Sequence, residues 1–378
     1  MSLLPSERDA LLPALRELTR AELAPLAEAA TPGRVSRELV AALGAHGVLA
    51  RLFPRELGGS ADGAPSATQL CALREAMAAE SPTVETTFAV QGLGSYPLLR
   101  DGSSQVARRW IPAVARGEAV AGFALSEPGA GSDAAALTLA ADPDGDGWRL
   151  TGQKTWISHA PDADVYTVFA RTTPDAGARG VSAFVVPGDA PGLTGAPIEL
   201  IAPHALGTLE FDGVRVGPDQ LLGERDAGFR VAMGTLDRFR PSVGAAAVGL
   251  AQRALEAALD HADQRKAFGG PLRALQAVAH RLADAATAIT SARLLVYEAA
   301  ATLDAGGRAT GIAAMAKLHA TEVAQRVVDD AVQVHGAAGL VAGAPVAELY
   351  REVRSLRIYE GASEVQRTII ARELYRDD

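Results

Sequence analysis

The sequence predicts an α+β protein that is mostly α-helical, with a helical N-terminal domain, a central barrel- or sandwich-like β domain and a C-terminal antiparallel four-helix bundle. Three observations support this prediction. Helical periodicity fills residues 1–119, dense turns with β-type runs fill 120–228, and long helical segments return in 229–378. We take these three ranges as the predicted domains, since 378 residues exceed one ordinary domain.

The first range repeats leucines at three- and four-residue steps, as at Leu11, Leu15 and Leu18. This spacing is typical of an amphipathic helix. Breakers such as Thr31-Pro32-Gly33 and Ser81-Pro82 interrupt the pattern. The range is therefore predicted to be helical, with turns at the breakers.

The central range contains turn-forming sequence such as Asp142-Pro143-Asp144-Gly145-Asp146-Gly147. Between the turns lie runs of β-branched, aromatic and alternating residues that predict strands: 148–151, 165–170, 182–186 and 211–216. These short strands with frequent turns indicate a compact β domain.

The last range contains four segments with helical period: 241–265, 272–305, 310–334 and 345–360. Glycine-rich sequence separates them, as at Gly269-Gly270-Pro271 and Gly306-Gly307. Four long helices with short connections predict an antiparallel bundle.

Composition limits the classes of function. The formal charge of -9 argues against a nucleic-acid partner, because phosphate binding needs a basic face. The single cysteine, Cys71, excludes an internal disulfide and is predicted to be a small core residue. The start shows no signal peptide, and no apolar run reaches the roughly 18–20 residues of a membrane span. We expect a soluble, cytoplasmic protein without a membrane partner.

The histidines do not predict a metal site. No pair has ligand spacing on one helical face, so we interpret them as structural. They are His159, His204, His280, His319 and His335.

Three segments carry candidate chemistry. Glu360 lies in Arg357-Ile358-Tyr359-Glu360-Gly361-Ala362-Ser363-Glu364-Val365-Gln366-Arg367, where glycine and small residues follow the carboxylate. Such a sequence can project a carboxylate into a cavity and leave backbone amides free for a ligand, although a solvated helix end is the commoner case.

The second segment is Phe123-Ala124-Leu125-Ser126-Glu127-Pro128-Gly129-Ala130-Gly131-Ser132-Asp133, an apolar strand that enters a Pro-Gly turn. A turn of this kind presents several amides at one point, which suits an anionic or heteroaromatic ligand. The third, Leu150-Thr151-Gly152-Gln153-Lys154-Thr155-Trp156-Ile157-Ser158, is predicted to be a strand that carries an aromatic residue beside hydroxyls.

Together these segments resemble the acyl-CoA dehydrogenases, flavoenzymes that desaturate acyl thioesters, and the resemblance covers nearly the whole chain. It implies FAD as cofactor and the order of a helical domain, a β domain and a helix bundle. It also implies that Glu360 is the catalytic base. In some family members the base lies at the position of Phe239, which cannot accept a proton, so Glu360 remains the candidate.

The resemblance assigns further site residues. Ser126 would bond the isoalloxazine, Trp156 would pack on it and Ser158 would donate to its N5 atom. Arg265 would contact the pyrophosphate, and the Gln333 segment would touch the FAD of a neighbouring subunit. The complete cofactor set is Phe123, Leu125, Ser126, Gly131, Ser132, Trp156, Ser158, Arg265, Phe268, Gln276, Gln333, Gly336, Ala362 and Glu364.

Ser132 would also lie beside the CoA part of the substrate, for which the resemblance implies a wider set. The substrate-binding candidates are Ser132, Asp237, Arg240, Tyr359, Gly361 and Arg372. For Glu85, two interpretations stay open: an exposed carboxylate, or a group that faces a polar acyl end.

The predicted reaction is α,β-desaturation of an acyl-CoA to a trans-2-enoyl-CoA. Glu360 would take the α-proton, its amide and a flavin ribityl hydroxyl would bind the thioester oxygen, and hydride would pass to FAD N5. Electron-transfer flavoprotein is the expected acceptor, and a homotetramer or homodimer the expected assembly.

Some residues depart from the family pattern. Ala337 replaces a glycine, Ala362 replaces a threonine, and residues 199–210 lack the Lys-Met-Gly-x-Arg pattern. These departures leave alternatives open: an oxidase or another flavoenzyme on this scaffold, an acyl-carrier-protein thioester as substrate, or a catalytically degenerate relative.

Overall fold

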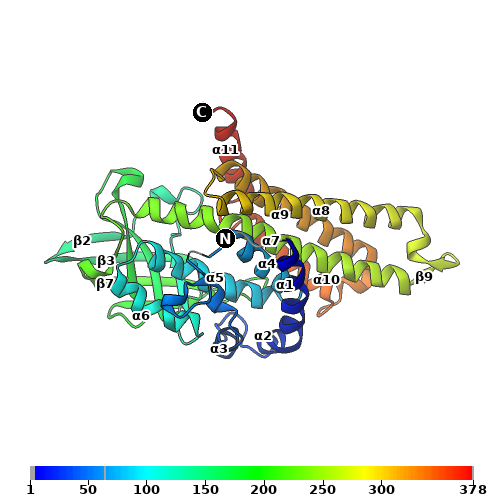
Figure 1. Ribbon diagram of the computed structural model, residues 1–378, viewed down its shortest axis with the longest axis horizontal. Coiled ribbons are helices and arrows are strands. Elements are labelled where there is room, and N and C mark those ends of the chain that lie inside the picture. Colours follow the sequence, from blue (N-terminus) through cyan, green and yellow to red (C-terminus); the bar gives the residue numbers. More distant parts are fainter. Residues whose placement is uncertain (1–4, 64, 377–378) are drawn as a thin grey trace. The chain divides into compact units, whose positions relative to one another are not determined.

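The computed structural model describes residues 5–63 and 65–376 of the chain (Figure 1). Its α-helices are α1 Pro5–Leu18, α2 Ala24–Glu28, α3 Arg37–Ala45, α4 Ala67–Ala78, α5 Pro82–Arg100, α6 Ser104–Ala115, α7 Gly228–Gln264, α8 Gln276–Asp304, α9 Thr310–His335, α10 Pro345–Val353 and α11 Ser363–Leu374. Its strands are β1 Ala121–Ala124, β2 Ala140–Asp144, β3 Gly147–Ser158, β4 Val165–Arg171, β5 Val181–Pro187, β6 Leu193–Pro197, β7 Leu206–Val216, β8 Leu221–Leu222, β9 Lys266–Ala267 and β10 Gly270–Pro271.

The element order confirms the predicted fold class: helices, then a β-sheet region, then helices again. In space the chain forms two compact units. Within the described residues, one unit combines 5–24, 66–85 and 237–376, and the other combines 25–65 and 86–236. Helices α1 and α4 thus share a unit with the C-terminal helices, whereas α3 and α6 belong to the unit that contains the sheet. The boundaries after 119 and 228 stay predictions.

The second unit contains one eight-stranded sheet. Its strands pair in the order β6-β7-β3-β2-β4-β5-β8, and β1 pairs with β4 in parallel. All but the last residue of β4 and of β5 are buried, which explains why these strands read as continuous apolar runs in the sequence.

β2 is missing from the strand prediction, because Asp142, Pro143 and Asp144 are typical of turns. The structure pairs these residues with β3 and limits the turn to Gly145 and Asp146. The antiparallel partner strand therefore overrides the local turn preference.

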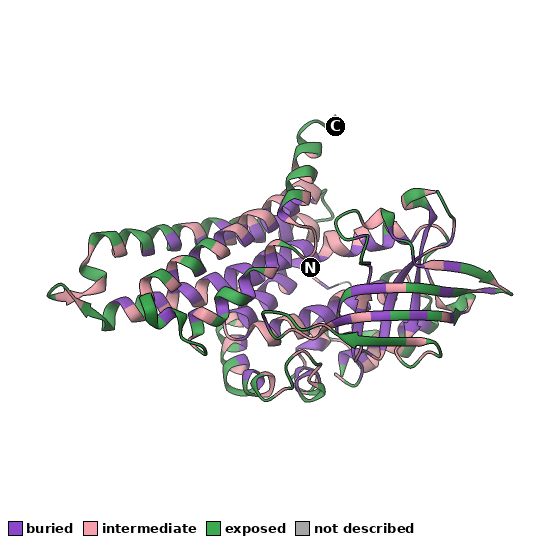
Figure 2. Cartoon of the chain, turned by 180° about the vertical axis from the view of Figure 1, so that it is seen from behind, coloured by how far each residue is buried: buried purple, intermediate pink, exposed green. Residues whose placement is uncertain are grey.

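The first unit contains a helical core rich in alanine. α8 and α9 run side by side (Figure 1), and buried residues follow one face of each helix (Figure 2). The core includes Ala246 of α7, Ala292 of α8 and Ala324 of α9. Cys71 of α4 is buried in the same core, as predicted. Small side chains let these helix axes approach closely.

Two predicted helix boundaries are wrong. α7 begins at Gly228 and continues through Pro241, which was expected to start the helix. α10 ends at Val353 rather than at Glu360, and a short 3-10 turn follows at Ser355–Arg357. Burial around Pro241, including Val243, offsets the loss of one helical hydrogen bond.

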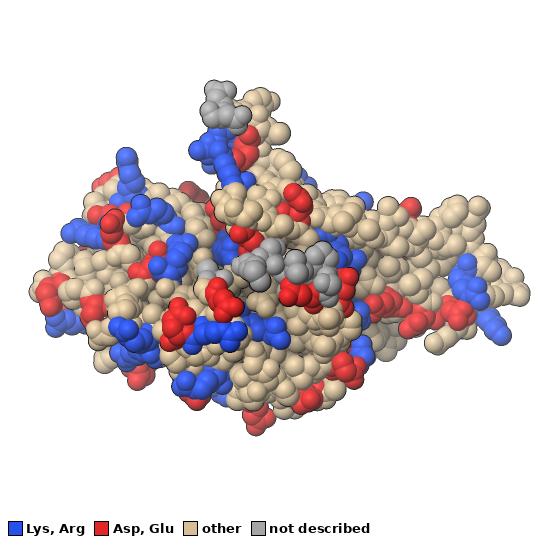
Figure 3. Space-filling view, viewed as in Figure 1, with Lys and Arg blue, Asp and Glu red and all other residues tan. Residues whose placement is uncertain are grey.

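The molecular surface carries both signs of charge. Figure 3 shows Lys and Arg interspersed with Asp and Glu over the face in view, without a continuous basic field. Across residues 5–63 and 65–376, no helix combines the length and apolar character needed to cross a membrane.

Candidate active site

Glu360 lies between the 3-10 turn Ser355–Arg357 and the start of α11. Its φ is 51°, and that of Gly361 is 94°, so two consecutive residues adopt left-handed backbone. The residue as a whole is half-buried, but its Oε2 atom is buried and has no hydrogen-bond partner. Backbone in this region is costly for a glutamate and is concentrated at functional sites. The local fold therefore holds a carboxylate with a free acceptor atom.

The environment of Glu360 combines burial with positive charge. Burial raises the pKa of its carboxyl group, while Arg74, Lys317 and Arg240 act in the opposite direction and Glu85 adds to the rise. The net direction is upward. Burial also lowers the pKa of Lys317 to about 8, and the attraction of Glu360 opposes that shift. A carboxylate in this position is more basic than an exposed one.

Arg74 and Glu85 form a buried ion pair, with side-chain exposures of 2% and 4%. The Arg74 guanidinium also donates a 2.8 Å hydrogen bond to Ser242 Oγ. The interpretation of Glu85 as an exposed carboxylate is therefore wrong. The pair compensates the cost of burying an arginine in the core that surrounds Glu360.

The structure brings most predicted substrate-binding residues of the first unit close to Glu360. Arg240 is 4% exposed, pairs with Asp237 and has a buried Nε atom without a partner. Tyr359 and Gly361 flank Glu360 directly. Arg372 lies elsewhere, exposed near the end of α11.

The predicted flavin loop is bound to the strand that carries Trp156. The Thr155 amide donates to Ser126 O at 3.0 Å, and Glu127 and Ala130 exchange two backbone hydrogen bonds of 3.1 Å. Ser132 is exposed, and a Cβ atom added at Gly129 or Gly131 would meet no atom within 4 Å. The loop is thus a tight turn with an open outer side. Phe123 and Leu125 at its base pack inward, with the Phe123 ring 5.0 Å from that of Phe169.

Trp156 lies on a β-bulge. The pairing of β3 with β7 shifts register between Lys154 and Ile157, and Trp156 has a φ of 59°. Its side chain is 56% exposed, whereas Ile157 is buried and Ser158 half-buried. A bulge turns one side chain away from the regular alternation. Here the bulge places the indole ring of Trp156 at the surface of the sheet.

The predicted nucleotide-binding residues lie at the other end of the helical unit, where Figure 1 shows β9 far from α11. Phe268 is 92% exposed with a φ of 51°. His261 and His335 stack there with ring centroids 4.3 Å apart. The remaining candidates at this end are also exposed: Arg265, Gln276, Gln333 and Gly336. Within the described residues they do not gather around Glu360.

Two cofactor candidates follow Glu360 directly. Ala362 is the N-cap residue of α11, and Glu364 is exposed in the first helical turn. Glu364 lies 3.9 Å from Arg367, a loose surface pair.

Four buried polar residues, Lys154 in the second unit and the others in the first, are missing from the sequence-based prediction although they lie beside candidate site residues of their own unit. They are Arg74, Lys154, Lys317 and Gln366, each at most 2% exposed. Lys317 offered a signal, since it interrupts the alanine-rich buried face of α9. A lysine on such a face needs a partner. The sequence does not say which one.

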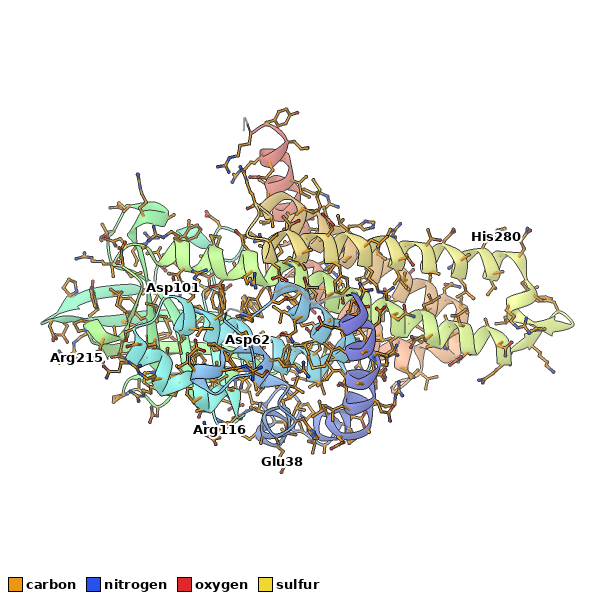
Figure 4. All side chains as sticks on the ribbon, viewed as in Figure 1. Glu38, Asp62, Asp101, Arg116, Arg215 and His280 are labelled. Atoms are coloured by element: carbon orange, nitrogen blue, oxygen red, sulfur yellow. The ribbon has the colours of Figure 1, made fainter. Side chains whose placement is uncertain are left out.

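The residues fit the FAD that the resemblance implies. Trp156 offers an exposed aromatic face, and Ser126 and Ser158 offer hydroxyls from segments that share a backbone hydrogen bond. The unpaired Glu360 Oε2 and Arg240 Nε leave polar atoms available to a ligand. Among the residues described, no three His, Cys, Asp or Glu side chains gather into a metal-binding group. The labelled His280 points outward from α8 (Figure 4).

Comparison with known proteins gives a consistent result. Family models of the acyl-CoA dehydrogenase N-terminal, middle and C-terminal domains match residues 5–118, 122–214 and 226–375. The probable acyl-CoA dehydrogenase FadE25 of Mycobacterium tuberculosis is 40% identical over 99% of this chain and 96% of its own length.

Solved structures agree with the sequence relatives. The butyryl-CoA dehydrogenase of Megasphaera elsdenii superposes with a TM-score of 0.93 at 32% identity, covering 99% of both chains. The FAD complex of PigA superposes with a TM-score of 0.92 at 27% identity, covering 99% of this chain and 98% of that chain.

Proposed function

Since this chain belongs to the acyl-CoA dehydrogenase family, we propose that Glu360 is the base that removes the α-proton of its acyl-CoA substrate. The protein is an FAD-dependent oxidoreductase that dehydrogenates a CH–CH bond of acyl-CoA thioesters.

The observation that carries the assignment is the buried, unpaired Oε2 atom of Glu360. An acceptor without a hydrogen bond is ready to take a proton from a bound substrate. Burial raises the proton affinity of the carboxylate, and the three nearby cations limit the rise. This balance suits a base that must be ionised before the reaction and must hold a proton after it.

The α-proton becomes acidic only if the thioester oxygen is stabilised as negative charge develops on it. The Glu360 amide is a suitable donor. Among the residues that the structure describes, this N–H donates to no other group of the chain. We assign it to the thioester carbonyl, with Asp237, Arg240, Tyr359 and Gly361 as neighbours of the acyl chain.

Ser126, Trp156 and Ser158 would hold the flavin ring, with Phe123, Leu125, Gly131 and Ser132 shaping the loop beneath it. When bound, FAD supplies the acceptor for the β-hydrogen and its electron pair. The two hydroxyls would donate to the ring as it gains negative charge. The Trp156 face would exclude water from one side of it.

The exposed residues at the β9 end support an assembly in which one copy contributes to the cofactor site of another. Arg265 and Phe268 flank β9, which Figure 1 shows far from α11, and Gln276, Gln333 and Gly336 lie at the start of α8 and the end of α9. In a homotetramer or homodimer, these residues would contact the FAD bound to a neighbouring copy of the chain. Arg372, Ala362 and Glu364 would complete the nucleotide contacts. We further propose electron-transfer flavoprotein as acceptor, and a cytoplasmic location.

The test is anaerobic mixing with acyl-CoAs of varied chain length and branching, followed by flavin absorbance. Wild-type protein should bleach with its preferred substrate, and Glu360→Gln should retain FAD but bleach at least about 10³-fold more slowly. Glu348→Gln is the matched control, because Glu348 is an exposed glutamate of α10. Full bleaching by Glu360→Gln would refute the assignment.

The same reaction carried out in air distinguishes a dehydrogenase from an oxidase. A dehydrogenase should yield little peroxide per enoyl-CoA formed, whereas equal amounts of both would indicate an oxidase. A colourless protein that binds no added FAD would indicate a degenerate relative.

A further inference from the structure

Two buried side chains from different helices hold the backbone beside the base. Lys317 Nζ of α9 donates to Gly361 O at 2.8 Å. Gln366 Nε2 of α11 donates to the same oxygen at 2.9 Å and to Glu360 O at 3.3 Å. Neither Lys317 nor Gln366 is exposed to solvent. Three hydrogen bonds thus converge on two consecutive carbonyl groups.

These two carbonyls belong to the left-handed turn formed by Glu360 and Gly361. A non-glycine residue at a φ of 51° is in a strained backbone conformation, so surrounding contacts must maintain it. A Cβ atom added at Gly361 would overlap Gln366 Nε2. The Gln366 amide therefore lies directly against the turn, and the Lys317 ammonium of α9 donates to the same turn.

A hydrogen bond alone does not require a lysine. A glutamine could donate to a carbonyl, and burying an ammonium costs far more than burying an amide. The property that only lysine or arginine adds here is positive charge beside the Glu360 carboxylate. The charged groups of the same cluster come from several helices: Arg74 of α4, Glu85 of α5, Arg240 of α7, Glu322 of α9 and Glu364 of α11. Glu352 of α10 acts on the neighbouring Tyr359.

Arg74 and Arg240 already have carboxylate partners, Glu85 and Asp237. The Lys317 ammonium has a carbonyl as its hydrogen-bond partner. Arg74 and Arg240 are thus each neutralised by a direct carboxylate contact, whereas the Lys317 ammonium contacts the carbonyl of the turn and brings its charge there.

We propose that Lys317 is a positioning residue for the reaction: it holds the Glu360–Gly361 turn through the Gly361 carbonyl and keeps the Glu360 carboxylate ionised in the free enzyme. This inference rests on the proposed role of Glu360 as base. It adds an electrostatic role to a lysine that contacts neither of the proposed reacting atoms.

The test measures kcat/KM against pH for Lys317→Met, Lys317→Gln and Lys317→Arg, with ferrocenium as acceptor and the best acyl-CoA of the panel. The acidic limb of this profile reports the ionisation of the base in the free enzyme. Loss of the charge should move that limb to a pH about one unit higher. At pH values on the acidic side of the limb, kcat/KM should therefore fall about tenfold. Lys317→Arg should return the limb towards its wild-type position.

Lys317→Gln keeps a hydrogen-bond donor, so it should fold even where Lys317→Met does not. An unshifted limb in a folded, FAD-loaded Lys317→Gln protein would overturn the inference. A purely structural lysine would instead lower the folded fraction or the FAD content at every pH without moving the limb. Glu360→Gln is measured in parallel. If Glu360→Gln is inactive and the acidic limb of Lys317→Gln stays at its wild-type position, only the proposed role of Lys317 is wrong. If Glu360→Gln is active, the assignment of Glu360 as the base is wrong.

Discussion

Lys154 Nζ lies 2.8 Å from Glu127 Oε1, and the two side chains are 0% and 3% exposed. The same ammonium donates to Leu125 O at 2.9 Å. Glu127 also accepts hydrogen bonds from Thr138 N, Thr138 Oγ1 and Leu139 N. Both ends of the predicted flavin loop are therefore fixed to β3 through one buried ion pair.

Breaking this pair should loosen the flavin loop. Lys154→Met leaves Glu127 buried without its cation, a change that costs about 3–5 kcal/mol. We expect lower stability in urea and a lower FAD-to-protein ratio. The double variant Lys154→Met/Glu127→Leu removes both charges and should recover most of the stability. Equal losses in the single and double variants would show that the pair does not hold the loop.

Replacing Gly361 should have two separate effects, one from its left-handed backbone and one from the overlap with Gln366. Gly361→Ala places a Cβ atom at a φ of 94° and against Gln366 Nε2, so either the Glu360 turn shifts or Gln366 moves and gives up the hydrogen bonds that hold this turn. A shift of about 1 Å at a reacting group can reduce the rate about 10²-fold, measurable as slower flavin reduction. Gly343→Ala is the control, since Gly343 has a φ of 84° with open space around it. Both variants should be less stable than wild-type protein, but only Gly361→Ala should show slower flavin reduction.

His159 should make the β unit sensitive to acid. It is 2% exposed, and its Nδ1 atom lies 2.9 Å from Ala121 O. Burial lowers the pKa of His159 to about 4. A depressed pKa contributes stability that is complete above the unfolded value near 6.5 and is lost as the pH falls through about 4. The loss over this window is about 3 kcal/mol.

Urea unfolding at several pH values tests this contribution. His159→Asn tolerates the left-handed backbone of the site, at a φ of 66°, and cannot titrate. Its stability should fall less between pH 6.5 and 4 than that of wild-type protein. His280→Asn changes an exposed histidine and should follow the wild-type curve. Parallel curves for wild type and His159→Asn would contradict the assignment.

Gly249 marks a close crossing of helices in the first unit. A Cβ atom there would overlap Glu75 O of α4. Gly249→Ala should therefore lower the free energy of unfolding by about 1–3 kcal/mol. Gly311→Ala in α9 meets only ordinary contacts of 3.4 and 3.5 Å with Glu373 and should gain about 0.5–1 kcal/mol of helix stability. Denaturation midpoints of the two variants should move in opposite directions.

Sequence periodicity predicted the element types well where one local preference dominated. The buried runs of β4 and β5 and the long segments of α8 and α9 lie close to their predicted ranges. Boundaries failed where tertiary contacts opposed a local preference. Pro241 lies inside α7, and Asp142 to Asp144 form a strand because β3 pairs with them.

The sequence by itself determined the fold class, the family and Glu360 as the candidate base, because motifs and periodicity are local properties of the chain. Only the tertiary structure decided what surrounds that base. Arg74 lies hundreds of residues before Glu360, and Lys317 belongs to another helix, so their effects on the Glu360 charge depend on distance and burial rather than on spacing along the chain. The bulge at Trp156 likewise depends on its pairing with β7. A buried charge acquires its chemistry from neighbours that the fold, not the local sequence, places beside it.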